Sequence, residues 1–379
     1  MIVLVDEATA KSAAAEKELL ESLGRLPGIE VRVHRVKGAE KTVTEVYLIG
    51  DTHRLALEDV ATLPGVERVV RVSEEYRIIG RHKDDRRASG FTYNGVEFSQ
   101  ETLNVFAGLC AVDTPENAEA LFAELAAFRQ VCTRMGAYKP RTNPYSFQGH
   151  GKACLPWVFE KAGKHGIRVI AMEVTHESHV DEIAESLEAT GRPTGVMLQI
   201  GTRNIQNFEL LKAVGRQPVF PVLVKRGFGI TLNESLNAAE YLASEGKSQI
   251  VFGLRGVKTN LGDPHRNLVD FAHVPVVKRL TRLPVCIDPS HSVGSRDRAP
   301  DGIPDLMHVT AQGVLAGANM VLVDFHPQPG KALVDGPQAL LLGELGWFLE
   351  DVAVARAAYE KRRALAQAHA AQPAAKTSA

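Results

Sequence analysis

The sequence predicts an α/β protein in which a (β/α)8 TIM barrel follows a small ferredoxin-like α+β domain. Two observations predict this fold class. From residue 103 onward, short apolar β-rich runs alternate with helical patterns, and about eight such alternations over about 250 residues are what a TIM barrel requires. Residues 1–80 instead follow the order strand, helix, strand, strand, helix, strand, which is the split ferredoxin-like arrangement.

The small domain is predicted element by element from its apolar periodicity. Leu19, Leu20 and Leu23 fall on one face of a helix, whereas the β-rich runs alternate or are continuously apolar. The expected order is a strand at 2–5, a helix at 10–24, strands at 29–36 and 43–49, a helix at 53–62 and a strand at 66–72. A domain of this kind attached to an enzyme is typically regulatory or structural. The charged run 81–87 predicts a solvated linker, and Asn94-Gly95 predicts the turn of a hairpin over 91–98.

The larger domain is predicted from eight runs that lack polar alternation, as strands buried on both faces do. These runs are 103–109, 135–138, 168–173, 196–199, 221–224, 249–254, 284–287 and 320–323. The helical patterns between and after them are clearest at 115–130, 178–190, 231–245, 304–317 and 337–352. A doubly wound open sheet is the rival, but it favours a Gly-rich phosphate-binding turn, and the chain has neither a G-x-G-x-x-G nor a Walker sequence.

Four parts of the chain follow from these patterns. We expect a ferredoxin-like domain at 1–80, a linker and hairpin at 81–98, the barrel at 99–355 and an Ala-rich tail at 356–379.

Composition and charge limit the partners. The chain carries 44 Lys and Arg against 45 Asp and Glu, which leaves no basic excess for nucleic acid. Four Cys in 379 residues form no disulfide framework. The apolar start at 2–5 is too short for a signal peptide, and the uncharged stretch 306–323 contains polar residues that a membrane span rarely tolerates. We therefore expect a soluble cytoplasmic protein with neither nucleic acid nor a membrane as its partner.

Residues that follow barrel strands converge on one face, where function is expected. The last two strands and the first are neighbours in a closed barrel, and they bring one thiol, one imidazole and two carboxylates together. These groups belong to Cys110, His291, Asp324 and Asp335. A donor set of such mixed softness suits a divalent transition metal, namely Mn, Fe, Co or Zn.

The remaining strand ends carry cations. They are Arg134, Lys139, Arg203, Lys225 and Arg255. Five positive charges in one cleft repel each other unless an anion binds there. A phosphorylated carboxylate, with about three negative charges, fits such a site because Arg gives bidentate contacts and Lys gives a point charge.

Several motifs resemble those of 3-deoxy-D-arabino-heptulosonate 7-phosphate (DAHP) synthases, and specifically of the type I beta group with its ferredoxin-like domain. The longest is G-A-Y-K-P-R-T-N-P-Y-S-F-Q-G at 136–149. Shorter agreements are Q-I-G-T-R-N-I-Q-N at 199–207, K-R-G at 225–227, D-P-S-H at 288–291 and H-P at 326–327. The similarity spans nearly the whole chain, including residues 37–51 of the small domain.

The resemblance implies a transferase that condenses phosphoenolpyruvate with erythrose 4-phosphate, the first step of the shikimate pathway towards the aromatic amino acids. It assigns phosphoenolpyruvate to the five cations above, with Lys139, Arg203 and Lys225 catalytic. It assigns the phosphate of the aldose to Arg141 and Thr142. It assigns a divalent metal to Cys110, His291, Asp324 and Asp335. It also implies an aromatic amino acid effector for the small domain and a homo-oligomer, commonly a tetramer.

The chain departs from the family pattern near the acceptor and metal sites. Asp324 stands where the family usually has Glu, Asp113 ends a changed A-G-P-C-S-V-E motif, and Asn143 replaces a Ser or Thr. Lys258 replaces a usual Arg, and Leu254 a usual Glu. Two alternatives stay open: a related phosphoenolpyruvate-dependent synthase that uses another aldose in specialised metabolism, and a catalytically silent regulatory homologue.

Overall fold

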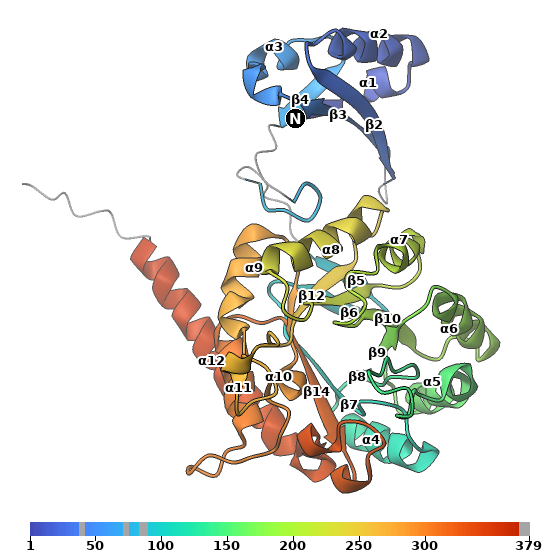
Figure 1. Cartoon of the computed structure of the whole chain (residues 1–379), viewed down its shortest axis with the longest axis vertical. Coiled ribbons are helices and arrows are strands. Elements are labelled where there is room, and N and C mark those ends of the chain that lie inside the picture. Colours follow the sequence, from blue (N-terminus) through green and yellow to red (C-terminus); the bar gives the residue numbers. More distant parts are fainter. Residues whose placement is uncertain (38–41, 71–75, 83–89, 371–379) are drawn as a thin grey trace, which may run out of the picture. The chain divides into compact units, whose positions relative to one another are not determined.

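The computed structural model describes residues 1–37, 42–70, 76–82 and 90–370. The chain divides into two compact units, Met1–Arg77 and Ile78–Ala379 (Figure 1). Most of the expected linker run 81–87, the end of the expected strand 66–72 and the last part of the expected tail lie outside the described residues.

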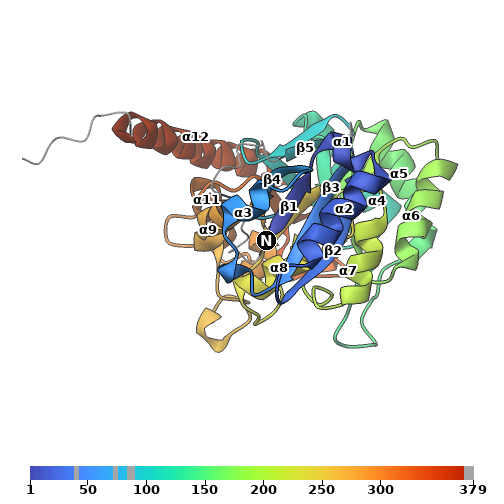
Figure 2. The same ribbon diagram turned by 90° about the horizontal axis from the view of Figure 1, so that it is seen from above.

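The first unit is an antiparallel sheet of four strands covered by helices, as the sequence predicts. Its strands lie in the order β2-β3-β1-β4, and its helices all cover one face (Figure 2). The strands are β1 (Ile2–Val5), β2 (Ile29–Lys37), β3 (Thr42–Gly50) and β4 (Val66–Val70), and the helices are α1 (Glu7–Ala10), α2 (Ala13–Gly24) and α3 (Leu57–Ala61). The ferredoxin-like arrangement is confirmed.

Both helices expected in this unit begin later than predicted. Ser12 accepts a hydrogen bond from the Ala15 amide and caps α2, so the helix expected at 10–24 begins only at Ala13, because Ser favours the N-cap over the helix interior. The short helix α1 precedes it. The pattern at 53–62 becomes a 3₁₀ turn, Thr52–Arg54, followed by α3.

Eight parallel strands form the barrel of the second unit. They are β7 (Asn104–Gly108), β8 (Cys132–Arg134), β9 (Val169–Val174), β10 (Gly195–Ile200), β11 (Val222–Lys225), β12 (Ile250–Leu254), β13 (Val285–Ile287) and β14 (Met320–His326). Each strand pairs with the next from β8 to β14. The ring closes through β7, which pairs with β14 over five positions and reaches β8 at the Leu109–Met135 bridge. The expected (β/α)8 barrel is confirmed.

A ring of helices surrounds these strands (Figure 1). They are α4 (Pro115–Ala127), α5 (Leu155–Lys164), α6 (Ser178–Ala189), α7 (Phe208–Arg216), α8 (Leu232–Ser244), α9 (Val274–Leu280), α10 (Pro289–Val293), α11 (Asp305–Leu315) and α12 (Leu345–Ala370). Among the residues that the structure describes, none of these helices has the length and apolar character needed to cross a bilayer.

The prediction of a helix at 337–352 is wrong for the first half of that range. The chain there forms two 3₁₀ turns, Gly336–Gln338 and Leu342–Glu344, on either side of a short strand, β15 (Leu340–Leu341). That strand pairs with the end of β14, so backbone pairing overrides the helical periodicity. Helix α12 starts only at Leu345 and continues as one helix through the expected tail boundary at 356.

Two strand predictions need correction because they bear on the site. The second barrel strand is Cys132–Arg134 and not 135–138, so Arg134 is its last residue and faces the interior. The last barrel strand extends to His326 and not 323, which places Asp324 within the strand. In both cases polar residues occupy the carboxyl end of a strand, where the apolar signal used for prediction disappears.

A hairpin packs against the core at the amino-terminal end of the barrel. Strands β5 (Gly90–Tyr93) and β6 (Val96–Ser99) are joined at Asn94-Gly95, and both turn residues have positive φ, as a type I′ turn requires. Val96 and Phe98 belong to the core cluster formed by side chains from the barrel strands. The hairpin therefore extends the barrel core at this end.

Closure of the barrel requires a residue without a side chain at the end of β7. A Cβ atom on Gly108 would lie 1.9 Å from the backbone oxygen of Arg134. We expect Gly108→Ala to lower the free energy of unfolding of the barrel by at least about 1–3 kcal/mol, because a backbone neighbour cannot move aside as a flexible side chain can. Both Trp residues, Trp157 and Trp347, lie in the barrel unit, so denaturant unfolding followed by Trp fluorescence measures the change.

The matched control is Gly343→Ala, since a Cβ there has no atom within 4 Å. Equal unfolding midpoints for the two variants would contradict the steric explanation.

Candidate active site

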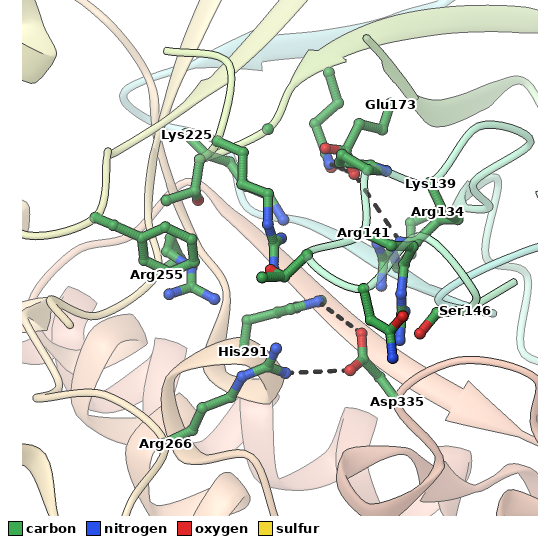
Figure 3. Close-up of a pocket in the computed structure, with 18 residues that line it drawn as sticks. Arg134, Lys139, Arg141, Ser146, Glu173, Lys225, Arg255, Arg266, His291 and Asp335 are labelled. Atoms are coloured by element: carbon green, nitrogen blue, oxygen red, sulfur yellow. Dashed lines mark hydrogen bonds and ion pairs between the residues drawn. The ribbon is translucent and has the colours of Figure 1, made fainter. Parts of the chain in front are cut away.

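A pocket of about 220 Å³ opens at the carboxyl ends of the barrel strands (Figure 3). It contains every residue that the sequence analysis assigned to an anion. These are Arg134, Lys139, Arg141, Thr142, Arg203, Lys225 and Arg255. Of the four residues assigned to a metal, His291 and Asp335 also line it. The strand ends thus bring together residues that are more than 200 positions apart in the sequence.

Four of the pocket cations are buried, at 2–7% exposure: Arg134, Lys139, Lys225 and Arg255. The Lys225 Nζ lies 2.5 Å from Asp288 Oδ2, and Arg134 is paired with Asp324. Within the described part of the chain, Arg255 Nη1 is buried without a hydrogen-bond partner, and burial lowers the Arg255 pKa to about 10. Because an isolated buried charge is costly, this guanidinium favours binding of an anion.

Phe228 lies among the cations on one side of the pocket. The Arg255 and Arg203 guanidinium carbons lie 4.8 and 5.4 Å from the centre of its ring, and the Lys258 Nζ lies 5.9 Å from it. Cation–π contact offsets part of the repulsion between these positive groups. Arg203 also donates to the Thr142 hydroxyl at 3.4 Å, which joins the buried cations to the exposed rim.

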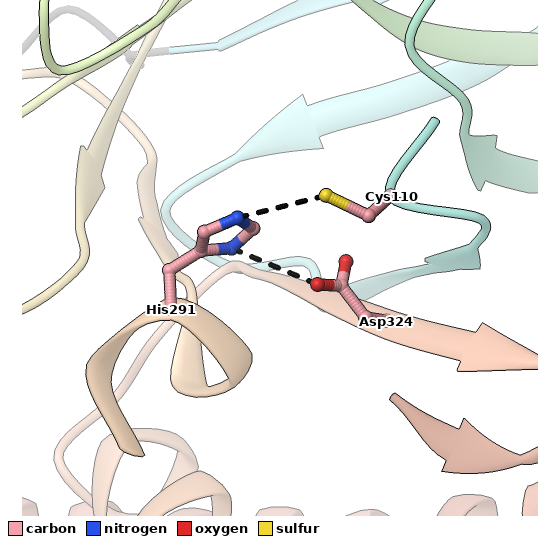
Figure 4. Close-up of side chains that lie close together, drawn as sticks. All are labelled: Cys110, His291 and Asp324. Carbon is pink, nitrogen blue, oxygen red and sulfur yellow. Dashed lines mark hydrogen bonds and ion pairs between the residues drawn. The ribbon is translucent and has the colours of Figure 1, made fainter. Parts of the chain in front are cut away.

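The four residues predicted as metal ligands meet beside this pocket. The Cys110 Sγ lies 3.8 Å from His291 Nε2, and one ligand atom from each of Cys110, His291 and Asp324 lies within 4.8 Å of the others (Figure 4). Asp335 Oδ2 lies 3.1 Å from the Cys110 Sγ and 3.5 Å from His291 Nε2. Sulfur, nitrogen and carboxylate oxygen therefore converge on one point.

The charges of this cluster fit a divalent cation. Burial alone would lower the pKa of His291, but the carboxylates of Asp288 and Asp324 outweigh it and raise that pKa to about 10. Burial would raise the pKa of Asp335, yet its hydrogen bond with His291 holds that pKa well below the usual range. Asp288 Oδ1 lies 3.0 Å from His291 Nδ1, which leaves Nε2 facing the other ligands, as the partner of a metal-binding His does.

The cation group and the ligand cluster are in direct contact. Arg134 is paired with Asp324, and Lys139 Nζ lies 3.3 Å from the Cys110 Sγ. The sequence predicted the cations and the ligands on separate sets of strand ends and did not predict this contact. Because β7 closes the ring between β14 and β8, Asp324 and Arg134 are only two strands apart and meet across the interior.

Sequence reasoning gave no role to several residues of the site. Glu173 is the penultimate residue of β9 and Asp288 directly follows β13, and that position could have identified them. The Glu173 carboxylate lies 4.0 Å from Lys139 Nζ and 3.4 Å from the Gln199 amide nitrogen. Arg266 lies in an irregular segment and Gln338 in a 3₁₀ turn. Neither directly follows a barrel strand, and no periodicity indicates them.

The departures from the family pattern have distinct surroundings. Asp113 turns away from the pocket and pairs with the buried His326 at 2.6 Å, while the Asn143 side chain accepts from the Tyr145 amide at 3.0 Å and lines the pocket. Asp324, one methylene shorter than Glu, still reaches the other ligands.

Comparison with known families agrees with this geometry. The model of the DAHP synthetase I family matches residues 93–358, and that of the DAHP synthase ferredoxin-like domain matches residues 1–74. The chain belongs to the DAHP synthetase I family. It is accordingly an enzyme, an aldol synthase of the transferase class.

Relatives of this family member carry two kinds of name. A phospho-2-dehydro-3-deoxyheptonate aldolase from Thermotoga maritima is 34% identical over 332 residues, which cover 87% of this chain and 91% of the relative. A crystal structure of that T. maritima enzyme (DAHP synthase) aligns with a TM-score of 0.66 at 29% identity, covering 93% of this chain and 95% of the other. A 2-dehydro-3-deoxyphosphooctonate aldolase from Acidithiobacillus ferrooxidans is 28% identical over 65% of this chain and 86% of its own length.

Asp288 is the counter-charge for both Lys225 and His291, and its removal tests the electrostatics of the site. We expect Asp288→Asn to lower the free energy of unfolding by about 3–5 kcal/mol, because it leaves buried positive charge without a partner. The control is Asp301→Asn, which removes an exposed pair with His308 and should leave the midpoint unchanged. Chemical unfolding followed by Trp fluorescence compares them, and a wild-type midpoint for Asp288→Asn would refute the assigned role.

Proposed function

We propose that this protein condenses phosphoenolpyruvate with erythrose 4-phosphate to give DAHP and phosphate, the first step of the shikimate pathway. The observation that carries the proposal is the direct contact between a group of buried cations and a Cys–His–Asp–Asp cluster in one pocket. A substrate held by the cations thus lies beside a site for a Lewis acid. The family and the name of the T. maritima relative support the same reaction.

Phosphoenolpyruvate occupies the buried part of the pocket in this proposal. Its phosphate and carboxylate supply a negatively charged partner for the buried Arg255 Nη1, which has none among the described residues. Arg203 and Lys225 line the same pocket. Arg134 and Lys139 complete the group. Arg gives paired hydrogen bonds and Lys gives concentrated charge, so the enol phosphate is oriented with its methylene towards the acceptor.

A divalent ion, of Mn, Fe, Co or Zn, would be held by Cys110, His291, Asp324 and Asp335. When bound, such an ion supplies Lewis acidity towards a carbonyl oxygen. Asp288 orients His291 for this role, and Arg134 limits the charge on Asp324.

The remaining groups orient the acceptor and move a proton. Arg141 and Thr142, at the rim, hold the phosphate of the aldose. The methylene carbon of phosphoenolpyruvate bonds to the aldehyde carbon, and Lys139 donates a proton to the oxygen that becomes an alkoxide. Lys139 lies between Cys110 and Glu173, within reach of both substrates. Water then adds to the enol carbon and phosphate leaves.

Three further assignments belong to this proposal. The ferredoxin-like domain binds an aromatic amino acid and inhibits the synthase, the protein works in the cytoplasm, and it forms a homo-oligomer such as a tetramer. The first of these is supported by the match of residues 1–74 to the family's own ferredoxin-like domain model.

A second acceptor is favoured by one observation. Several relatives are named 2-dehydro-3-deoxyphosphooctonate aldolase, and Asn143 lines the pocket beside the residues proposed for the aldose phosphate. A longer phosphorylated aldose is therefore the alternative substrate.

The reaction is tested with purified full-length protein, Mn²⁺, phosphoenolpyruvate and a panel of phosphorylated aldoses. We expect loss of enol absorbance and release of one phosphate per product with erythrose 4-phosphate. Chelation should abolish turnover and added Mn²⁺ should restore it, while Cys110→Ser should weaken metal binding. Turnover only with a longer aldose selects the alternative, and no turnover with any metal or aldose indicates a silent homologue.

Regulation is tested by removing residues 1–77. The cut leaves Ile78 and Ile79, whose amides donate to Glu240 in the barrel unit. We expect tyrosine or phenylalanine to inhibit the full-length protein and not the truncated one, with similar uninhibited rates. Inhibition that persists after truncation would place the effector site outside the small domain.

A further inference from the structure

Gln338 lies next to the ligand cluster but contributes no atom to it. It is the last residue of the 3₁₀ turn Gly336–Gln338, which directly follows Asp335, and its side chain is 1% exposed. Its Nε2 donates to Asp324 Oδ2 at 2.6 Å, and its Oε1 accepts from Arg266 Nη1 at 2.8 Å. The same Arg266 nitrogen lies 3.2 Å from Asp335 Oδ1.

Only one orientation of this amide satisfies both partners. A guanidinium can only donate and an ionised carboxylate can only accept, so Oε1 must face Arg266 and Nε2 must face Asp324. Both hydrogen bonds involve a charged group and polarise the amide in the same direction. The chain Arg266–Gln338–Asp324 is therefore directional and stronger than two neutral bonds.

Gln338 is one of two side chains that donate hydrogen bonds to the Asp324 carboxylate among the described residues. Asp324 is fully buried; Arg134 occupies its Oδ1 and Gln338 its Oδ2. The nearest other cationic nitrogen, His291 Nδ1, is 3.9 Å away and closer to Asp288. Without Gln338, Oδ2 loses its donor and the carboxylate can rotate away from Cys110 and His291.

The same turn also restrains the fourth ligand. Asp335 has a left-handed backbone conformation, with φ of 56°, and its carbonyl accepts from the Gln338 amide at 3.2 Å. Through Arg266, the Gln338 side chain is also linked to the Asp335 carboxylate. One amide thus connects the carboxylates of two ligands that come from different segments.

We propose that Gln338 is a positioning residue for metal binding, fixing the carboxylates of Asp324 and Asp335 relative to Cys110 and His291. The inference rests on the metal role proposed above for these four residues. Its consequence is that the neutral amide, and not only the ligands, sets the affinity and geometry of the site.

The test is titration of the metal-free full-length protein with Co²⁺, followed by optical absorption. A thiolate-to-Co²⁺ charge-transfer band reports Cys110, and the d–d bands report geometry. Gln338→Met keeps the length of the side chain and removes both hydrogen bonds. We expect about 10–100-fold weaker Co²⁺ binding, as for other partners of metal ligands, together with altered d–d bands. With saturating metal, kcat should fall more than the KM for phosphoenolpyruvate changes.

Two further variants complete the design. Gln312→Met alters an exposed glutamine on α11 and should leave affinity and spectrum at wild-type values. Arg266→Met, at a partly exposed side chain, tests the chain if Gln338→Met does not fold, and it should weaken binding and shift the d–d bands. In the double variant the losses should be smaller than their sum, because both act through one network.

The outcomes separate this inference from the function on which it rests. A wild-type protein without the thiolate band would overturn the metal site and this inference together. If the wild-type protein shows the thiolate band but Gln338→Met has unchanged Co²⁺ affinity and unchanged d–d bands, the positioning role alone is overturned. If Gln338→Met does not fold, the same result in Arg266→Met overturns it.

Discussion

The buried contact between Arg134 and Asp324 is the interaction on which the site depends. One residue belongs to the anion-binding group and the other to the metal-type cluster, so this pair makes the two groups a single electrostatic unit. Burial of so many charges is tolerated because each carboxylate neutralises a neighbour. Asp324 pairs with Arg134, and Asp288 pairs with Lys225 and His291. Removal of one partner of such a pair lowers the free energy of unfolding by more than the pair's net contribution to stability, because the other charge stays buried without a partner. The pocket is therefore held in place largely by its own functional groups.

Closure of the barrel creates this contact. Strand β7 lies between β14 and β8, and it carries Gly108 where the backbones approach most closely. The absence of a side chain there allows Leu109 to bridge to Met135, so Cys110 leaves the strand towards His291. The close backbone packing at Gly108 thus also determines where the Cys110 thiol lies.

Much of this arrangement could be predicted from the sequence. Continuous apolar runs identified most barrel strands, and the residues after them, such as Cys110 and Lys225, converge because parallel strands end at one face. The periodicity failed where polar residues replace apolar ones. Arg134 precedes the run predicted as its strand, and Asp324 follows the run predicted as its own, but both residues lie inside strands. Their mutual contact was therefore missed. Gln338 was not predictable, because a 3₁₀ turn that β15 stabilises carries no periodic signal and the helical pattern at 337–352 pointed elsewhere.

The hairpin at the amino-terminal end of the barrel affects the path by which substrates can reach the pocket. Phe98 and Val96 pack with Phe106 and other residues of the barrel strands into an apolar core. In the proposed reaction, both reactants and the released phosphate would therefore pass through the mouth of the pocket at the carboxyl ends of the strands. Under that proposal, the substrate bound at the buried guanidinium of Arg255 would enter before the one bound at the rim by Arg141. An aldose bound first would obstruct the path to Arg255, so the proposed arrangement would require phosphoenolpyruvate to bind before the aldose.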